Sequence, residues 1–204
     1  MFKKMAADAL GLSDIGTIIS PADYDKADAD DYVMHEDNEK IYFLIKTKAD
    51  EYCFTNLALI HVDGESAVSS KRTLKRYPYS QHKISGVLLE TAGKIDMDVE
   101  IKFMIGGQHF DIDVRKDQIE QLKDLYKSLL RIAEITYDNG LHMDMATQSL
   151  DKAAMILQSS RTDDQNLAGT YKGLTDFSFE WLTSAHDKYY VKDFGHVFEK
   201  YINN

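Results

Sequence analysis

The sequence has few residues that form cross-links or interrupt helices and strands. It has one cysteine, Cys53, and two prolines among 204 residues. One cysteine cannot form an intrachain disulfide, so a packed core must hold the fold, and a reducing compartment is expected. Cys53 stands within an apolar run, which favours a buried, inert thiol over a nucleophile.

Long apolar runs are also missing. No stretch approaches the roughly 18 apolar residues of a membrane-spanning helix. The two lysines near Met1 are not followed by the apolar core of a signal peptide. We therefore expect a soluble, cytoplasmic protein.

Motifs for catalysis or cofactor binding are missing as well. There is no Gly-rich phosphate loop or metalloprotease helix motif, and Ser66 lacks the second glycine of a nucleophile elbow. His109, Asp111 and Asp113 share one face of a predicted strand, but side chains on such a face point in parallel, and Lys102 is their predicted neighbour. We predict no catalytic, cofactor-binding or metal-binding residues and no enzymatic activity.

The net charge of −10 is unevenly distributed. Residues 1–38 carry nine acidic and three basic groups and residues 117–204 carry fourteen and nine, whereas residues 39–116 are balanced. Acidic flanks repel nucleic acid and anionic lipid at long range, so we expect no nucleic-acid partner and consider membrane binding unfavourable. The length suits one core with an appended piece.

Strand patterns fill the balanced middle of the chain. Alternating or wholly apolar segments predict strands at residues 41–46, 52–61, 69–77 and 87–91. The clearest is a hairpin at Gly106-Gly107, a two-residue turn that tolerates positive φ at both positions. With this turn, the sequence numbers of two residues paired across the hairpin add up to 213, so Phe103 pairs with Phe110. One face is apolar and the other polar, as expected for a sheet with one side on a core.

A strongly helical pattern follows over residues 117–133. Its apolar residues recur at three- and four-residue steps and should cover the apolar face of the strands. Asp117 and Glu120 predict a capping box at its start. Asp138-Asn139-Gly140 predicts a turn or helix stop, after which residues 140–204 should form a helical hairpin with an interruption near Gly195.

A basic and aromatic cluster lies around the third predicted strand. Its members are Lys71, Arg72, Lys75, Arg76, Tyr77 and Tyr79. The charges fit an edge strand protected against aggregation, a contact surface for an acidic partner such as the acidic flank of a neighbouring subunit, or a site for lipid headgroups.

Aromatic residues are concentrated in the last segment, and they spread over more of a helical wheel than one partner helix covers. A large apolar surplus usually marks a subunit interface. The candidate interface residues are Phe177, Phe179, Trp181, Tyr190, Phe194 and Phe198.

Several short segments within residues 1–133 form a recognisable set. They are Phe54-Thr55-Asn56, Leu59-Ile60, Val62-Asp63, Pro78-Tyr79, and Glu90-Thr91-Ala92-Gly93 followed by Asp96, Asp98, Glu100 and Lys102. Together they resemble the bacterial pleckstrin-homology-like (PH-like) domain family, and residues 140–204 resemble the helical extension of one branch. The resemblance implies an α+β fold: a PH-like antiparallel β-barrel or bent sheet capped by one helix, followed by an α-helical hairpin.

The resemblance also sets the expected organisation and function. We expect an N-terminal segment and acidic linker at 1–38, the PH-like domain at 39–136 with its capping helix at 117–133, and the hairpin extension at 140–204. The family implies a non-enzymatic, ring-forming homo-oligomer that binds a protein partner, here unknown. The alternative is a module that binds phosphoinositides or a membrane surface, although the first two strands lack the basic cluster of lipid-binding relatives.

Overall fold

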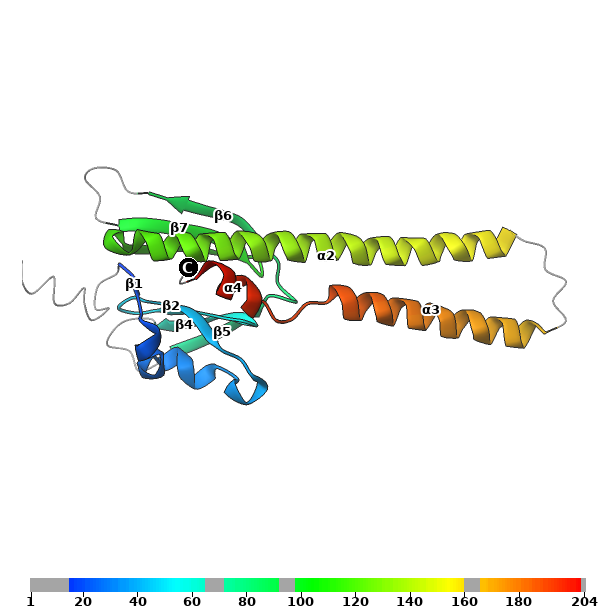
Figure 1. Ribbon diagram of the computed structural model, residues 1–204, viewed down its shortest axis with the longest axis horizontal. Helices are drawn as coiled ribbons and strands as arrows, with labels where there is room; N and C mark the ends of the chain where they lie inside the picture. The colour runs from blue at the N-terminus through cyan, green and yellow to red at the C-terminus, as the bar shows by residue number, and fades with distance from the viewer. Residues whose placement is uncertain (1–14, 65–71, 92–97, 160–165, 203–204) are drawn as a thin grey trace, which may run out of the picture. The chain divides into compact units, whose positions relative to one another are not determined.

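The computed structural model describes residues 15–64, 72–91, 98–159 and 166–202 (Figure 1). The chain divides into two compact units. Unit 1 is Met1–Glu134 with Lys192–Asn204, and unit 2 is Ile135–Val191. The architecture is α+β, as the sequence predicts.

Unit 1 contains two antiparallel sheets. The first has the order β1 (Thr17–Ile18), β2 (Ile41–Lys46), β3 (Glu51–Thr55), β4 (Ala58–Gly64), β5 (Arg72–Pro78). The second has the order β6 (Ile84–Glu90), β7 (Asp98–Ile105), β8 (Gln108–Arg115). A single parallel bridge between Gly16 and Val114 joins their edges. Of the two predicted forms, the described strands therefore make bent, facing sheets and not a closed barrel.

The β7–β8 hairpin has the predicted register. Phe103 pairs with Phe110 and Lys102 pairs with Asp111. Gly106 and Gly107 have φ values of 59° and 77°, the left-handed region that a two-residue turn of this kind requires. The rings of Phe103 and Phe110 stack with centroids 5.1 Å apart, and Phe103 also contacts Phe54 of the first sheet. These aromatic contacts form the centre of the core between the sheets.

The predicted strand at 52–61 is wrong, because the structure has two strands there. The Thr55 hydroxyl oxygen accepts hydrogen bonds from the backbone N–H groups of Leu57 (3.1 Å) and Ala58 (2.9 Å), which turn the chain between β3 and β4. Both strands are buried on both faces, so no alternation in the sequence reveals the turn.

Helix α2 (Ile119–Ser159) begins after a short 3-10 turn, η4 (Lys116–Gln118). The predicted capping box is wrong: Asp117 pairs with Arg115, at 2.6 Å for the closest contact, and Glu120 pairs with Lys123. The first half of α2 does supply the predicted apolar stripe. Its fully buried residues are Leu122, Leu125, Leu129 and Ile132.

The predicted helix stop at Asp138-Asn139-Gly140 is also wrong, since α2 continues through it to Ser159. A glycine inside a helix costs about 1 kcal/mol relative to alanine. Here the packing of the helix on both sides of Gly140 outweighs that cost. Ile132, which precedes the glycine in the helix, and Ala146, which follows it, are both buried.

Unit 2 is an antiparallel helical hairpin of the second half of α2 and α3 (Leu167–Tyr189). The Trp181 indole N–H donates to the Ala146 carbonyl oxygen at 3.2 Å. Further along the pair, the rings of His142 and Tyr189 stack with centroids 4.9 Å apart. The hairpin itself agrees with the sequence-based expectation.

The chain then returns to unit 1. As expected, the last helical segment is interrupted near Gly195, where α4 (Gly195–Tyr201) begins. Phe194 and Phe198 are fully buried against Tyr79, with ring centroids 5.8 and 6.2 Å from it. A segment distant in sequence therefore completes the core of unit 1.

Residues 21–39, which we call the acidic strap, cover the face of the first sheet that points away from the second. They form three 3-10 turns, η1 (Pro21–Lys26), η2 (Asp28–Tyr32) and η3 (His35–Asp37). Ala27, Ala29 and Val33 of the strap pack on a buried apolar row from β2, β3 and β4. The row consists of Leu44, Cys53, Ile60 and Val62.

Candidate functional site

The main candidate surface is the apolar exterior of unit 2. Of the sixteen large hydrophobic side chains exposed among the described residues, eleven belong to unit 2. They are Tyr137, Leu141, Met145, Met155, Ile156, Leu157, Tyr171, Leu174, Phe177, Phe179 and Trp181. A surface with so many apolar groups is typical of an interaction site.

On α2, five of these residues form a stripe. At about 3.6 residues per turn, Tyr137, Leu141, Met145, Met155 and Ile156 fall within about 100° of one another, on the side away from Ala146. Ala146 is the residue whose carbonyl oxygen receives the α3 indole. The second half of α2 is thus apolar on two sides, and α3 covers one of them.

The predicted interface residues lie in two different places. Phe177, Phe179 and Trp181 are exposed on α3, Phe179 most strongly at 72%. Tyr190 is half-buried at the end of α3 and stacks on His186. Phe194 and Phe198, in contrast, are buried in unit 1, so the prediction that these two lie on an open surface is corrected. Helical spacing could not distinguish them, because the chain leaves α3 just before Phe194.

The predicted basic cluster lies on β5, at one end of the first sheet as an edge strand should. Its charges have partners within the chain. Arg72 pairs with Asp28 of the strap at 3.4 Å, and Arg76 pairs with Glu39 of the strap at 2.8 Å. The Lys75 ammonium pairs with Asp63 of β4 at 2.9 Å.

The aromatic members of this cluster are packed inward. Tyr79 is buried against α4, and Tyr77 is half-buried with its ring edge-on to Phe110. Lys71 lies outside the described residues. The described members of this cluster are therefore paired within the chain or packed, and a contact with an acidic partner or a lipid headgroup stays a prediction.

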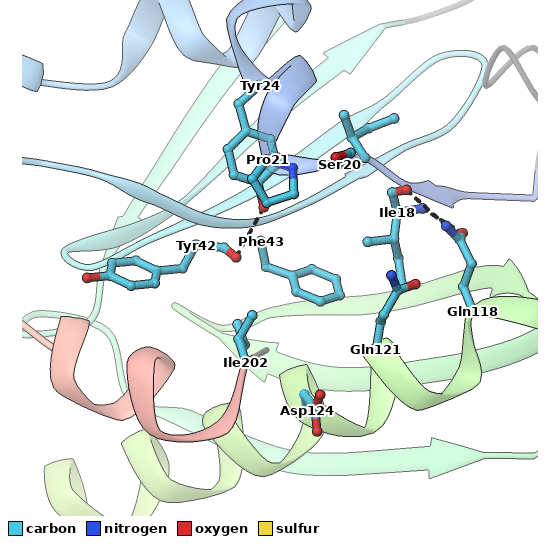
Figure 2. Close-up of a pocket in the computed structure, with 11 residues that line it drawn as sticks. Ile18, Ser20, Pro21, Tyr24, Tyr42, Phe43, Gln118, Gln121, Asp124 and Ile202 are labelled. Carbon is cyan, nitrogen blue, oxygen red and sulfur yellow. Dashed lines mark hydrogen bonds between the residues drawn. The ribbon is translucent and has the colours of Figure 1, made fainter. Parts of the chain in front are cut away.

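A cavity of about 220 Å³ lies between the strap, β2, the start of α2 and Ile202 (Figure 2). Its wall combines apolar and polar groups. Its lining residues include Ile18, Pro21, Tyr24, Phe43, Gln118 and Asp124.

Most polar groups around this cavity are already bonded. The Gln118 side-chain amide exchanges two hydrogen bonds with the Ile18 backbone, at 2.8 and 3.0 Å. The Tyr24 hydroxyl donates to the Tyr42 carbonyl oxygen, and Asp124 pairs with Lys127. The volume is below the roughly 300–1,000 Å³ of drug-sized sites. The cavity could hold a small apolar group, but its polar lining offers little for recognition.

An acidic group on the exposed face of the second sheet is the one candidate for metal ligands among the described residues. Carboxylate oxygens of Glu100, Asp111 and Asp113 lie within 4.8 Å of one another. The Lys102 ammonium bonds Glu100 at 2.6 Å and lies 3.6 Å from Asp111. Its hydrogen bonds lower the pKa of Glu100 and are in turn the main cause of a raised pKa of Lys102. The lysine therefore already supplies a cation to Glu100 and Asp111.

The packing of the strap on the first sheet and its ion pairs with β5 were not predicted from the sequence. The signal was present in its eight acidic residues and one lysine, which alternate with small apolar residues and precede a basic strand. Without the fold, nothing showed that the acidic segment and the basic strand belong to the same surface.

Two antiparallel sheets packed face to face, with a buried stripe of a following helix, define unit 1 as a PH-like fold. The chain belongs to the bacterial PH domain family, whose profile matches residues 9–133. Residues 144–204 match a second profile, described as a YvbH-like oligomerisation region. Self-association of the C-terminal part is therefore indicated.

Three relatives illustrate this relationship. The uncharacterized protein YvbH of Bacillus subtilis is 74% identical over the full length of both chains. YjqA of the same organism is 31% identical over 99 residues, which are 47% of this chain and 76% of that protein. A crystal structure of a PH-domain-containing protein from Exiguobacterium sibiricum superimposes with a TM-score of 0.84 at 55% identity, covering 93% of this chain and all of that chain.

Within the described ranges, no helix combines the length and the apolar character needed to cross a bilayer.

Proposed function

We propose that this protein is a non-enzymatic scaffold of the cytoplasm that assembles into a homo-oligomer through unit 2 and presents its PH-like domains to a protein partner. The observation that carries the proposal is the concentration of exposed apolar side chains on the hairpin. Exposing such a surface to water is unfavourable, and burying it against other copies removes that cost.

The two-sided pattern of α2 supports an assembly of more than two helices. One side of the helix packs on α3 through Ala146, and the stripe of Tyr137, Leu141, Met145, Met155 and Ile156 is available to another hairpin. Hydrophobic positions on two sides of one helix are what a helix in a bundle needs. The match to an oligomerisation region gives independent support.

We further propose a closed ring. If the α2 stripe of one copy contacts a different surface of the next, such as the α3 side with Phe177 and Phe179, the contact is head-to-tail. A head-to-tail contact whose rotation closes produces a cyclic oligomer. The family resemblance also implies this form.

Light scattering coupled to size-exclusion chromatography tests the proposal. The wild-type chain should elute as one oligomer, and Leu141→Asp with Met145→Asp should shift it to smaller species, because each places a charge in an apolar contact. Thr147→Asp is the matched control, since this exposed residue lies on the same helix outside the stripe. A wild-type monomer at micromolar concentration would contradict the proposal, as would an oligomer that the double variant leaves intact.

A further inference from the structure

The acidic strap is attached to the first sheet by few apolar contacts. Only Ala27, Ala29 and Val33 of its apolar residues are buried, and they are small. Of its larger apolar residues, Tyr32 and Met34 are exposed, and Tyr24 is half-buried against the same row. Apolar burial stabilises in proportion to area, so these four side chains hold the strap weakly compared with a helix or strand of the core.

Charge complementarity supplies much of the remaining attachment. The ion pairs Arg72–Asp28 and Arg76–Glu39 join the strap to β5. The Glu51 carboxylate of β3 accepts a hydrogen bond from the Ala29 backbone N–H at 2.7 Å. Asp28 and Arg72 remain partly exposed, with 54% and 35% of their side chains accessible, so this pair is open to competition by salt and by other acidic groups.

We propose that this face of the first sheet is a binding surface for an acidic, extended protein segment, and that residues 21–39 occupy it as a displaceable intramolecular ligand. The surface combines an apolar row, Leu44, Cys53 and Ile60, with two arginines at the edge strand. Its partner is a segment of the strap's own chemistry: acidic residues that alternate with small apolar ones. This inference concerns unit 1 and does not depend on self-association through unit 2.

The chain contains its own reporter of strap opening. Cys53 is the only cysteine, it lies under the strap, and no part of it is exposed. Burial also raises the pKa of its thiol, so the closed form offers neither access nor a thiolate. Alkylation of Cys53 under native conditions therefore measures how often the strap opens.

The first experiment compares alkylation rates of full-length variants. Arg72→Ala removes one exposed ion pair and should speed the reaction by about two- to five-fold. Arg76→Ala leaves the Glu39 carboxylate buried without this partner and should speed it by more than about ten-fold. Lys75→Ala, whose partner Asp63 belongs to β4 and not to the strap, should leave the rate unchanged.

Global unfolding would also expose Cys53, and denaturant distinguishes the two routes. Opening of the strap exposes little surface, so the alkylation rate should rise with denaturant much less steeply than the unfolding equilibrium does. A rate that follows global unfolding in slope and across the variants would overturn the displaceable strap. Equal rates for Arg72→Ala and Lys75→Ala would also overturn it.

The second experiment tests the surface for an acidic segment. A fluorescent peptide with the sequence of residues 21–39 should bind Val33→Asp protein, whose strap is loosened while the sheet is intact, at least ten-fold more tightly than wild type. Adding Arg72→Ala to that protein should weaken binding, and a peptide with Asn at the positions of Asp28 and Glu39 should bind less. If Cys53 of Val33→Asp reacts quickly but the peptide does not bind, the proposed binding surface is wrong.

Discussion

The two units place similar apolar side chains in opposite environments. Of the thirty-one buried hydrophobic residues among those described, thirty belong to unit 1, and Ala146 alone belongs to unit 2. Unit 1 encloses its apolar groups between two sheets, the start of α2 and α4. Unit 2 is two helices, and each can cover only one side of the other. The difference shows that topology, more than composition, decides which apolar residues need a partner from outside.

The boundary between these environments does not follow the order of the chain. The segment that begins at Lys192 belongs to the core of unit 1, although it follows the hairpin. Asn56 ties it there, because its carbonyl oxygen accepts from the Phe194 N–H at 2.8 Å and its side-chain amide donates to Asp193 at 2.8 Å. The hairpin is thus inserted into unit 1, not appended to it.

Truncation of the chain should have the largest effect on stability. A chain that ends after Thr136 should fail to fold stably, since it loses Phe194, Val197 and Phe198 from the core and uncovers Tyr79. Removing one such ring costs about 3–5 kcal/mol, and the whole stability of a domain is about 5–15 kcal/mol. Circular dichroism during denaturant unfolding gives the result. A truncated chain as stable as the full one would show that α4 is an appendage.

A single ring of the core should have the next largest effect. Phe103→Ala should lower the free energy of unfolding by about 3–5 kcal/mol, because the ring is buried against Phe54 and Phe110. Met104→Ala, the next residue on the exposed face of β7, should change it by no more than about 0.5 kcal/mol. Equal losses in denaturant melts would contradict the assigned faces of the hairpin.

A smaller effect is expected on the acidic face of the second sheet. Desolvation, followed by the carboxylates of Glu100 and Asp98, raises the pKa of Asp113. The folded state therefore binds this proton more tightly than the unfolded state, and the resulting stability is present at low pH and lost as pH rises through the raised pKa. Asp113→Asn should stabilise the protein at pH 7 by less than about 1 kcal/mol, since solvent screens this site.

The pH dependence of the melts decides this prediction. The difference in unfolding free energy between Asp113→Asn and wild type should shrink as the pH falls from 7 towards 4 and as salt is added. A difference that is constant with pH would assign the effect to packing instead of charge.

The smallest effect is expected for Phe179. Because its ring is 72% exposed, Phe179→Ala should change the stability of unit 1 by no more than about 0.5 kcal/mol. Denaturant unfolding followed by the far-ultraviolet circular dichroism of the strands, which belong to unit 1, measures this. A loss comparable to that of Phe103→Ala would show that the two units do not differ in the way described.

Local chemistry was sufficient to predict some features from the sequence. The turn at Gly106-Gly107 fixes its register, because two glycines with positive φ leave one way to pair the flanking strands. The buried stripe of α2 and the presence of a second helix after it were likewise visible as periodicity. These features depend on neighbours within a few residues.

Features that depend on distant contacts were not predictable. The exposed Phe179 and the buried Phe198 both belong to the aromatic-rich last segment, and only the return of α4 to unit 1 separates them. The partners of Arg72 and Arg76 are 44 and 37 positions away in the sequence. The helix end predicted at Gly140 was wrong for a related reason. Tertiary packing on both sides of the glycine outweighed its low intrinsic helix propensity.

The position of the single tryptophan has a spectroscopic consequence. Trp181 lies on α3, and its indole N–H is hydrogen-bonded to the Ala146 carbonyl oxygen across the hairpin. Excitation at the red edge of protein absorbance therefore selects a chromophore in unit 2 alone, while the single thiol lies in unit 1. Trp181 is partly exposed, so its emission maximum should shift to shorter wavelength when the hairpins of associating copies remove it from water. No introduced label is needed.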